Sequence, residues 1–130
     1  MKLSEVVHTL QAEVLCGEEW LDCEIDTICG ADLMSDVLAF ATGRTILLTG
    51  LTNIQVVRTA FLSDLVGIVF IRGKKPGADI IAMAAEKGIP LMATAYPMYE
   101  ACGRLYFRQT QEPKRCGDQV ERQSKNFARV

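Results

Sequence analysis

The sequence predicts an α/β fold, a compact three-layer α/β/α domain with a mostly parallel sheet. Between residues 45 and 94, short apolar runs alternate with amphipathic runs, and the connections between them are short. This alternation is typical of parallel strands joined by right-handed helical crossovers that cover the sheet. The chain has 130 residues, 49% of them hydrophobic and 23% charged, which is the composition of one globular domain.

The first 30 residues predict a helix and two strands. Residues 3–11 carry apolar side chains at helical spacing, namely Leu3, Val6, Val7 and Leu10. Residues 12–17 form a short apolar run that predicts a strand, and we expect a turn after it in which Trp20 anchors onto the core. Residues 23–30 alternate imperfectly between apolar and polar side chains, which predicts a second strand.

The middle of the chain predicts the main part of the sheet. Residues 31–43 predict a helix that Asp32 caps and Gly43 ends. The run "RTILLTG" is typical of a strand buried on both faces, and the following helix would be capped by Thr52 or Asn53. A second buried strand is expected in "LVGIVFI".

The last predicted elements follow the same alternation. Residues 77–88 predict a helix that ends at Gly88, and "IPLMAT" predicts a strand. Residues 96–104 predict a short helix with Pro97 in its first turn, and "LYF" predicts a final edge strand. We therefore expect a domain over residues 1–108 and a polar tail over residues 109–130, which is either mobile or stabilised by a partner.

Composition and cysteine spacing exclude several classes of protein. No apolar run approaches the roughly 18–20 residues of a membrane span, and "MKLSEVVHTL" lacks the apolar core of a signal peptide. The five cysteines include no C-x-x-C pair, and the single histidine, His8, lies far from them in the sequence. We therefore expect no metal site, no cofactor and no membrane association, and free thiols in a cytoplasmic protein.

The charges are distributed unevenly although the net charge is only −2. Residues 13–36 contain eight acidic residues and no basic one, which indicates either a solvated face or a face that meets a basic partner. A protein that binds duplex DNA needs positive charge over most of the domain, so we expect no nucleic-acid partner.

Three loops are expected at the carboxyl ends of the parallel strands, where open α/β sheets bind ligands. Each loop leads into a helix, so each can direct backbone N–H groups and a positive helix end toward an anion. The candidate ligand-binding residues are Thr49, Thr52, Asn53, Arg72, Gly73, Lys74, Gly77, Thr94 and Tyr96. In "RGKKPG", the glycines and the proline either shape the turn and leave the lysines solvated, or the loop binds an anion.

The sequence does not predict a catalytic site. "RGKKPG" lacks the G-x-x-x-x-G-K-[S/T] spacing of a P-loop, and no G-x-G-x-x-G occurs. His8 lies far in sequence from the candidate loops, so no Ser or Cys there has a histidine base near it in the chain. Glu100 and Arg104 predict a surface ion pair, and Cys102 predicts a packing residue. We therefore expect that the protein is not an enzyme.

The segment "GIVFIRGKKPGADIIAMAAEKGIPLMATAYPMYEACGRL" and the opening "MKLSEVVHTLQAEVLCG" resemble the DRTGG domain family. The pentapeptide Asp-Arg-Thr-Gly-Gly itself is absent. The resemblance implies a regulatory or dimerising domain of the kind attached to phosphotransacetylases and CBS-containing pyrophosphatases. It also implies a relation to the N-terminal domain of HPr kinase/phosphorylase, whose catalytic P-loop half has no counterpart here.

Taken with the loops, the resemblance predicts a non-catalytic regulatory or ligand-sensing module. It would bind a nucleotide or another phosphorylated anion at the strand-end loops. The alternative prediction is a homodimeric accessory or docking subunit of a larger metabolic or redox enzyme complex, with no ligand of its own. The expected partners are thus a second copy, an enzyme and a small anionic ligand.

Overall fold

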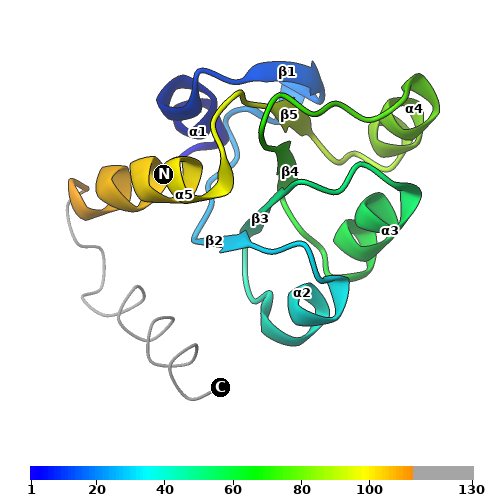
Figure 1. Cartoon of the computed structure of the whole chain (residues 1–130), viewed down its shortest axis with the longest axis horizontal. Coiled ribbons are helices and arrows are strands. Elements are labelled where there is room, and N and C mark those ends of the chain that lie inside the picture. The colour runs from blue at the N-terminus through cyan, green and yellow to red at the C-terminus, as the bar shows by residue number, and fades with distance from the viewer. Residues whose placement is uncertain (113–130) are drawn as a thin grey trace.

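A computed structural model describes residues 1–112 and confirms the α/β fold class (Figure 1). Five strands form one sheet in the order β1-β5-β4-β3-β2, in which β1 is antiparallel to β5 and all other pairs are parallel. The strands are β1 (Glu13–Cys16), β2 (Thr27–Gly30), β3 (Thr45–Thr49), β4 (Gly67–Phe70) and β5 (Leu91–Ala93).

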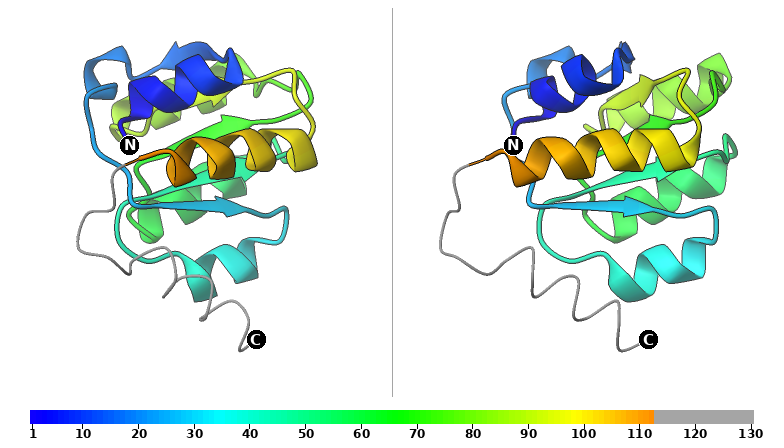
Figure 2. Two further views of the ribbon diagram at one scale, coloured as in Figure 1. Left: turned by 90° about the vertical axis from the view of Figure 1, so that its left-hand side faces the viewer. Right: turned by 60° about the vertical axis from the view of Figure 1, so that its left-hand side comes forward.

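Helices cover both faces of the sheet, which gives the three layers that the sequence predicts. The helices are α1 (Leu3–Leu10), α2 (Met34–Phe40), α3 (Ile54–Leu62), α4 (Ala78–Glu86) and α5 (Met98–Thr110), and a short 3-10 helix, η1, spans Glu18–Trp20. Helices α1 and α5 lie on one face, and α2, α3 and α4 lie on the other (Figures 1 and 2).

The core consists of two layers that share the central strands. Leu47, Ile68 and Phe70 pack toward α2, α3 and α4, whereas Ile46 and Leu48 pack toward α1 and α5. All five residues of β3 are buried, as expected for a strand covered on both faces. Burying one large aliphatic side chain stabilises a fold by roughly 1.5–3 kcal/mol, so this strand is a main source of stability.

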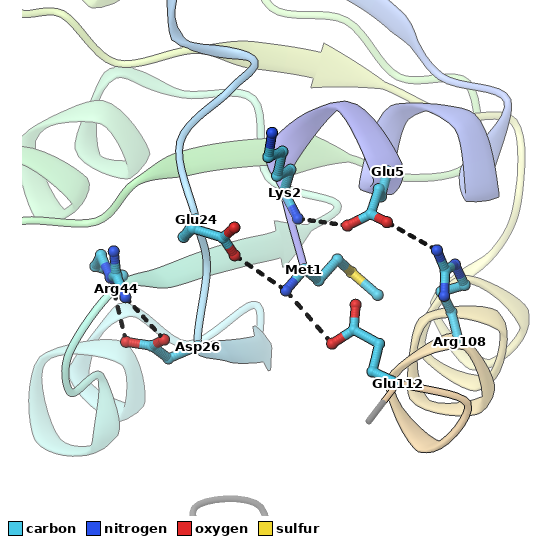
Figure 3. A network of polar contacts seen from close by, with 8 residues as sticks. All are labelled: Met1, Lys2, Glu5, Glu24, Asp26, Arg44, Arg108 and Glu112. Carbon is cyan, nitrogen blue, oxygen red and sulfur yellow. Dashed lines mark hydrogen bonds and ion pairs between the residues drawn. The ribbon is translucent and has the colours of Figure 1, made fainter. Parts of the chain in front are cut away.

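A polar network fastens α1 to α5 beside the sheet (Figure 3). The backbone N–H of Lys2 donates to the Glu5 carboxylate at 2.7 Å, which satisfies a donor in the first turn of α1. The other oxygen of Glu5 accepts from Arg108 of α5 at 2.8 Å. The Met1 ammonium lies 3.3 Å from Glu24 and 3.4 Å from Glu112. These contacts hold the end of α5 against the start of the chain.

Several local predictions are wrong. Gly43 does not end α2, because the helix already ends at Phe40, where its C-cap Ala41 has an extended backbone. Leu105, Tyr106 and Phe107 belong to α5 and not to an edge strand, because Leu105 continues the buried helical face that begins at Ala101. Asp32 does not cap α2, whose N-cap is Leu33, because the Asp32 carboxylate binds the loop after β3 instead.

The other two differences concern the segment before β2. Only residues 27–30 of the predicted second strand pair in the sheet, because residues 23–25 form backbone hydrogen bonds with residues 1–3 instead. Trp20 is 43% exposed and does not anchor onto the core, because it lies in η1 at the edge of the sheet. The predicted tail falls almost entirely on residues 113–130, which lie outside the described part of the chain.

Candidate ligand site at the carboxyl ends of the strands

The structure brings the three predicted loops together at the carboxyl edge of β3, β4 and β5. Backbone hydrogen bonds continue past the strand ends and join the loops. The N–H of Ile71 donates to Thr49 at 3.0 Å, and the N–H of Gly73 donates to Thr94 at 2.8 Å. The N–H of Arg72 donates to Tyr96 at 2.9 Å. The loop after β4 therefore lies between the other two and is fixed to both.

Arg72 occupies an unfavourable backbone conformation in this loop. Its φ is 58° and that of Gly73 is 68°, and the N–H of Lys74 donates to the carbonyl of Ile71 at 3.1 Å. Positive φ at both central residues is the pattern of a type I′ turn, which favours Gly, Asn or Asp. A left-handed conformation costs a residue such as arginine about 1–2 kcal/mol. Residues with strained backbone conformations are common at functional sites, where the surrounding structure maintains the strain.

The Arg72 side chain reaches back over the loop that follows β3. A Cβ atom placed on Gly50 would lie 2.5 Å from Nη2 of Arg72, so the guanidinium covers the Gly50 backbone. Arg72 is exposed, and no carboxylate of residues 1–112 forms an ion pair with it. Its positive charge is therefore held at the strand ends and is open to solvent.

Asp32 also lies at this edge and binds the loop after β3, although its place in the sequence predicts a helix cap. Its carboxylate accepts hydrogen bonds from the Thr49 hydroxyl at 3.0 Å and from the Gly50 N–H at 2.8 Å. These bonds connect the loop after β2 to the loop after β3. The sequence signal for this role is its position two residues after β2 at the carboxyl edge, where Asp and Asn side chains orient loops.

Two predicted ligand-binding residues face inward. Thr49 and Thr94 are both buried. The Thr94 hydroxyl donates to the carbonyl of Leu10 at 2.8 Å and accepts from the N–H of Tyr96 at 3.3 Å. The Thr49 hydroxyl is bonded to Asp32 and also accepts from the N–H of Leu51. Both threonines therefore support the loops from the interior of the domain.

Thr52 and Asn53 precede α3. Asn53 is the N-cap of α3, as predicted, although its side chain forms no capping hydrogen bond and is exposed. The first turn of α3 contains no acidic residue, so nothing in the helix neutralises its positive end. Thr52 is partly buried beside it.

Lys74 and Gly77 lie farther along the loop before α4. Lys74 is exposed, whereas its neighbour Lys75 forms an ion pair with Glu13 at 2.5 Å. Gly77 is the N-cap of α4, and a Cβ there would lie 2.8 Å from an oxygen of Asp79. The Asp79 carboxylate already faces the positive end of α4, so the start of α3 is the better place for an anion.

Tyr96 is partly buried and lies under an arginine. The guanidinium of Arg104 is 4.2 Å from the centre of the Tyr96 ring, a cation–π distance. Arg104 is also paired with Glu100 at 3.1 Å, which confirms the predicted ion pair on this helix. That Tyr96 stacks on a base or ring of a ligand stays a prediction.

The cysteines do not form a reactive or metal-binding group in the described part of the chain. Burial raises the pKa of the Cys16, Cys29 and Cys102 thiols, so these side chains are protonated near neutral pH. The Cys102 thiol lies 3.7 Å from the sulfur of Met98, which agrees with a packing role. Residues 1–112 contain no cluster of three or more His, Cys, Asp or Glu side chains that could hold a metal ion.

A shallow pocket of about 330 Å³ lies at the opposite edge of the sheet, before β3, β4 and β5. Trp20, Arg44, Asp64 and Gly88 are among the residues that line it, and it contains none of the predicted site residues. No helix within residues 1–112 is both long and apolar enough to cross a membrane.

Comparison with known proteins identifies the family. The family model for the DRTGG domain matches residues 5–106. No curated protein matches. Among solved structures, the chain is similar to the CBS and DRTGG domains of the regulatory region of Clostridium perfringens pyrophosphatase, solved with its activator diadenosine tetraphosphate. The TM-score is 0.65 at 18% sequence identity, and the match covers 80% of this chain and 45% of that one. The chain belongs to the DRTGG domain family.

Proposed function

We propose that this protein is a non-catalytic regulatory domain that binds a nucleotide or another phosphorylated anion at the carboxyl ends of β3 and β4. The main support for this proposal is the position of the Arg72 side chain. Its guanidinium is held in a strained turn over Gly50, and it is exposed and forms no ion pair within residues 1–112. A planar guanidinium with parallel N–H donors is the side chain best matched to a phosphate.

The neighbouring groups complement such a ligand. The first turn of α3 presents backbone N–H groups that no acidic side chain of that turn faces, and Thr52 and Asn53 add short polar side chains beside them. Lys74 adds a second exposed positive charge on the same loop as Arg72. The family and the nucleotide-bound regulatory region of similar fold support a sensing role.

A thermal-shift titration tests the proposal with diadenosine tetraphosphate, ATP, acetyl phosphate and inorganic phosphate. A ligand that binds only the folded state at about 100 times its Kd stabilises that state by about 2.7 kcal/mol. We expect at least one of the three organic phosphates to raise the unfolding temperature in a saturable manner. A flat response to all four would contradict the proposal.

Two variants show whether the expected shift arises at this site. Arg72→Gly removes the guanidinium and also relieves the left-handed strain of about 1–2 kcal/mol, so the variant should stay folded but lose the shift. Arg44→Ala removes an equal charge from the opposite edge, where Arg44 forms only an exposed pair with Asp26 at 3.3 Å. The proposal requires that Arg44→Ala retain the shift, and equal shifts in both variants would place the ligand elsewhere.

The second candidate function is a homodimeric accessory or docking subunit without a ligand. The observation in its favour is a set of large apolar side chains that are exposed at α2, α3 and α5: Leu33, Leu38, Phe61, Leu62, Tyr99, Tyr106 and Phe107. These residues form two separate groups, because α5 lies on one face of the sheet and α2 and α3 lie on the other. Exposed apolar surface of this kind often marks an interaction site. Light scattering tests self-association, and a monomer at high concentration that also captures no partner enzyme would exclude this candidate.

A further inference from the structure

The outward face of α5 carries three large aromatic side chains that are exposed. Tyr99 is 92% exposed, Tyr106 59% and Phe107 66%, while Ala101 and Leu105 on the opposite side of the helix are buried. Gly103 lies between the aromatic residues on the outward side, with no heavy atom near the place a Cβ would occupy. A helix at a protein surface normally turns charged and polar side chains outward. Here both sides of the helix carry apolar side chains.

The charged residues beside this face are already paired within the chain. Glu100 and Arg104 form an ion pair at 3.1 Å, and Arg108 is paired with Glu5 of α1 at 2.8 Å. The face therefore presents aromatic rings flanked by neutralised charges. A surface of this kind fits an apolar partner surface and does not repel a copy of itself.

The spacing of the aromatic residues favours a second copy as the partner. Tyr99 lies four residues before Gly103, and Phe107 lies four residues after it. Residues four apart form one ridge along a helix. If two α5 helices cross antiparallel on a two-fold axis at Gly103, Tyr99 of each copy meets Phe107 of the other. A two-fold interface needs this kind of self-complementary patch.

Packing within the domain gives no reason for a glycine at position 103. Its position in the middle of α5 is unfavourable for helix formation. Nothing within 4 Å would obstruct a side chain there, so packing inside the domain does not require a glycine. A glycine at the crossing point lets two helix backbones approach closely.

We propose that the outward face of α5 is the interface of a homodimer in which two α5 helices pack antiparallel at Gly103. Aromatic side chains bury roughly 150–250 Å² each. Scaled by their exposed fractions, the six aromatic side chains of two copies would bury roughly 650–1,100 Å². This is about half of the roughly 1,200–2,000 Å² in a specific interface. A stable dimer therefore requires a similar area from the residues beside these aromatic side chains.

The inference rests on the homodimer of the second candidate function, for which it specifies the surface and the partner. It does not depend on the ligand, because Arg72 and Gly50 lie at the strand ends and not on α5. A protein that is monomeric at all concentrations would refute the homodimer altogether. A dimer that is insensitive to α5 substitutions would refute only the interface.

Sedimentation equilibrium of the full chain, whose monomer mass is 14.3 kDa, tests the inference over a wide range of concentrations. We expect a dimer that Gly103→Gln weakens at least tenfold in Kd, because the new side chain separates the helices. At dilutions where every variant is monomeric, Gly103→Gln should keep or raise the unfolding temperature, since glutamine is the better helix former. Tyr99→Ser combined with Phe107→Ser should weaken the dimer further.

Ala85→Gln, which adds the same bulk at an exposed position of α4, is the matched control and should leave the Kd unchanged. Equal effects of Ala85→Gln and Gly103→Gln would overturn the inference, and so would a wild-type dimer with unchanged affinity in both α5 variants. Removing residues 113–130 from the wild type and from the Gly103→Gln variant tests whether the chain's own tail, and not a second copy, occupies this face. Dimerisation that appears only after this removal would show that the chain's own tail covers α5, which also contradicts the proposal.

Discussion

The candidate site depends on a contact between two residues that are far apart in the sequence, Gly50 and Arg72. Glycine at position 50 leaves room for the Arg72 guanidinium, and the left-handed conformation of Arg72 directs its side chain there. Three backbone hydrogen bonds hold the turn, donated by Arg72, Gly73 and Lys74. The strained turn therefore places one positive charge at the strand ends.

Gly50→Ala tests this arrangement. The three atoms nearest to the added Cβ all belong to Arg72, with Nη2 at 2.5 Å, and the end of a flexible side chain can move away. Because φ of Gly50 is not in the left-handed region, alanine fits the backbone, and we expect the free energy of unfolding to change by less than about 1 kcal/mol. The displaced guanidinium should lower phosphate-ligand affinity about tenfold, or about 1.4 kcal/mol.

Urea unfolding and isothermal titration calorimetry with the ligand found in the thermal-shift titration measure the two quantities. Gly73→Ala serves as a contrasting variant, because its φ of 68° penalises a side chain in the backbone although nothing lies within 4 Å. It should lose stability. Unchanged ligand affinity in Gly50→Ala would show that the position of Arg72 over Gly50 does not matter for binding.

At the scale of elements, α1 is fastened at its first turn by Glu5. The Lys2 N–H donates to one oxygen, and Arg108 of α5 donates to the other (Figure 3). The backbone hydrogen bond from Lys2 is the main cause that holds the pKa of Glu5 below its ordinary value of 4.5, and Arg108 contributes in the same direction. Glu5 therefore joins two helices that are adjacent on one face of the sheet.

Glu5→Gln should destabilise the protein by about 0.5–1 kcal/mol at pH 7, the range of a partly exposed ion pair. Because the pKa of Glu5 is lower in the folded state, its stabilisation is present above pH 4.5 and is lost as the pH falls through the folded pKa. The stabilities of the variant and the wild type should thus converge as the pH falls well below 4.5. Urea unfolding at pH 7 and at acidic pH measures this convergence.

Glu19→Gln removes an exposed carboxylate from η1 and should have little effect at either pH. A difference between Glu5→Gln and the wild type that persists undiminished at low pH would mean that the ionised carboxylate is not the stabilising group.

At the scale of the whole molecule, the two core layers are coupled through single strands. Leu47 and Leu48 are adjacent in β3, and they pack into opposite layers. Both side chains are fully buried. A perturbation on either side of the sheet is therefore transmitted through the same backbone.

Leu47→Ala and Leu48→Ala should each destabilise the protein by about 2–5 kcal/mol, the usual cost of a leucine-sized cavity. Each variant should nevertheless unfold in one cooperative transition. The fluorescence of Trp20, the single tryptophan, and far-UV circular dichroism report on different parts of the fold. Noncoincident transitions in these two measurements would show that the layers unfold separately.

Much of the architecture could be predicted because its causes are local. The apolar runs around β3 and β4 and the amphipathic runs between them follow from periodicity, and the structure confirms the parallel order that they imply. The wrong predictions concern residues whose conformation depends on a tertiary contact. Asp32 has the residue type of a helix cap, but the loop after β3 offers it two donors. Leu105 to Phe107 read as a strand, but the buried position of Leu105 extends α5.

The sequence by itself determined the fold class, the edge of the sheet where polar loops gather, and the family. These depend on residue type and spacing, which are properties of the chain. The tertiary structure alone decided which of those polar residues face outward. Thr49 and Thr94 are buried and form hydrogen bonds within the domain, whereas the Arg72 side chain lies over Gly50. The tertiary structure also showed that α5 is apolar on its outer side. The physical reason is that burial and side-chain direction depend on contacts between segments distant in sequence, which no local pattern encodes.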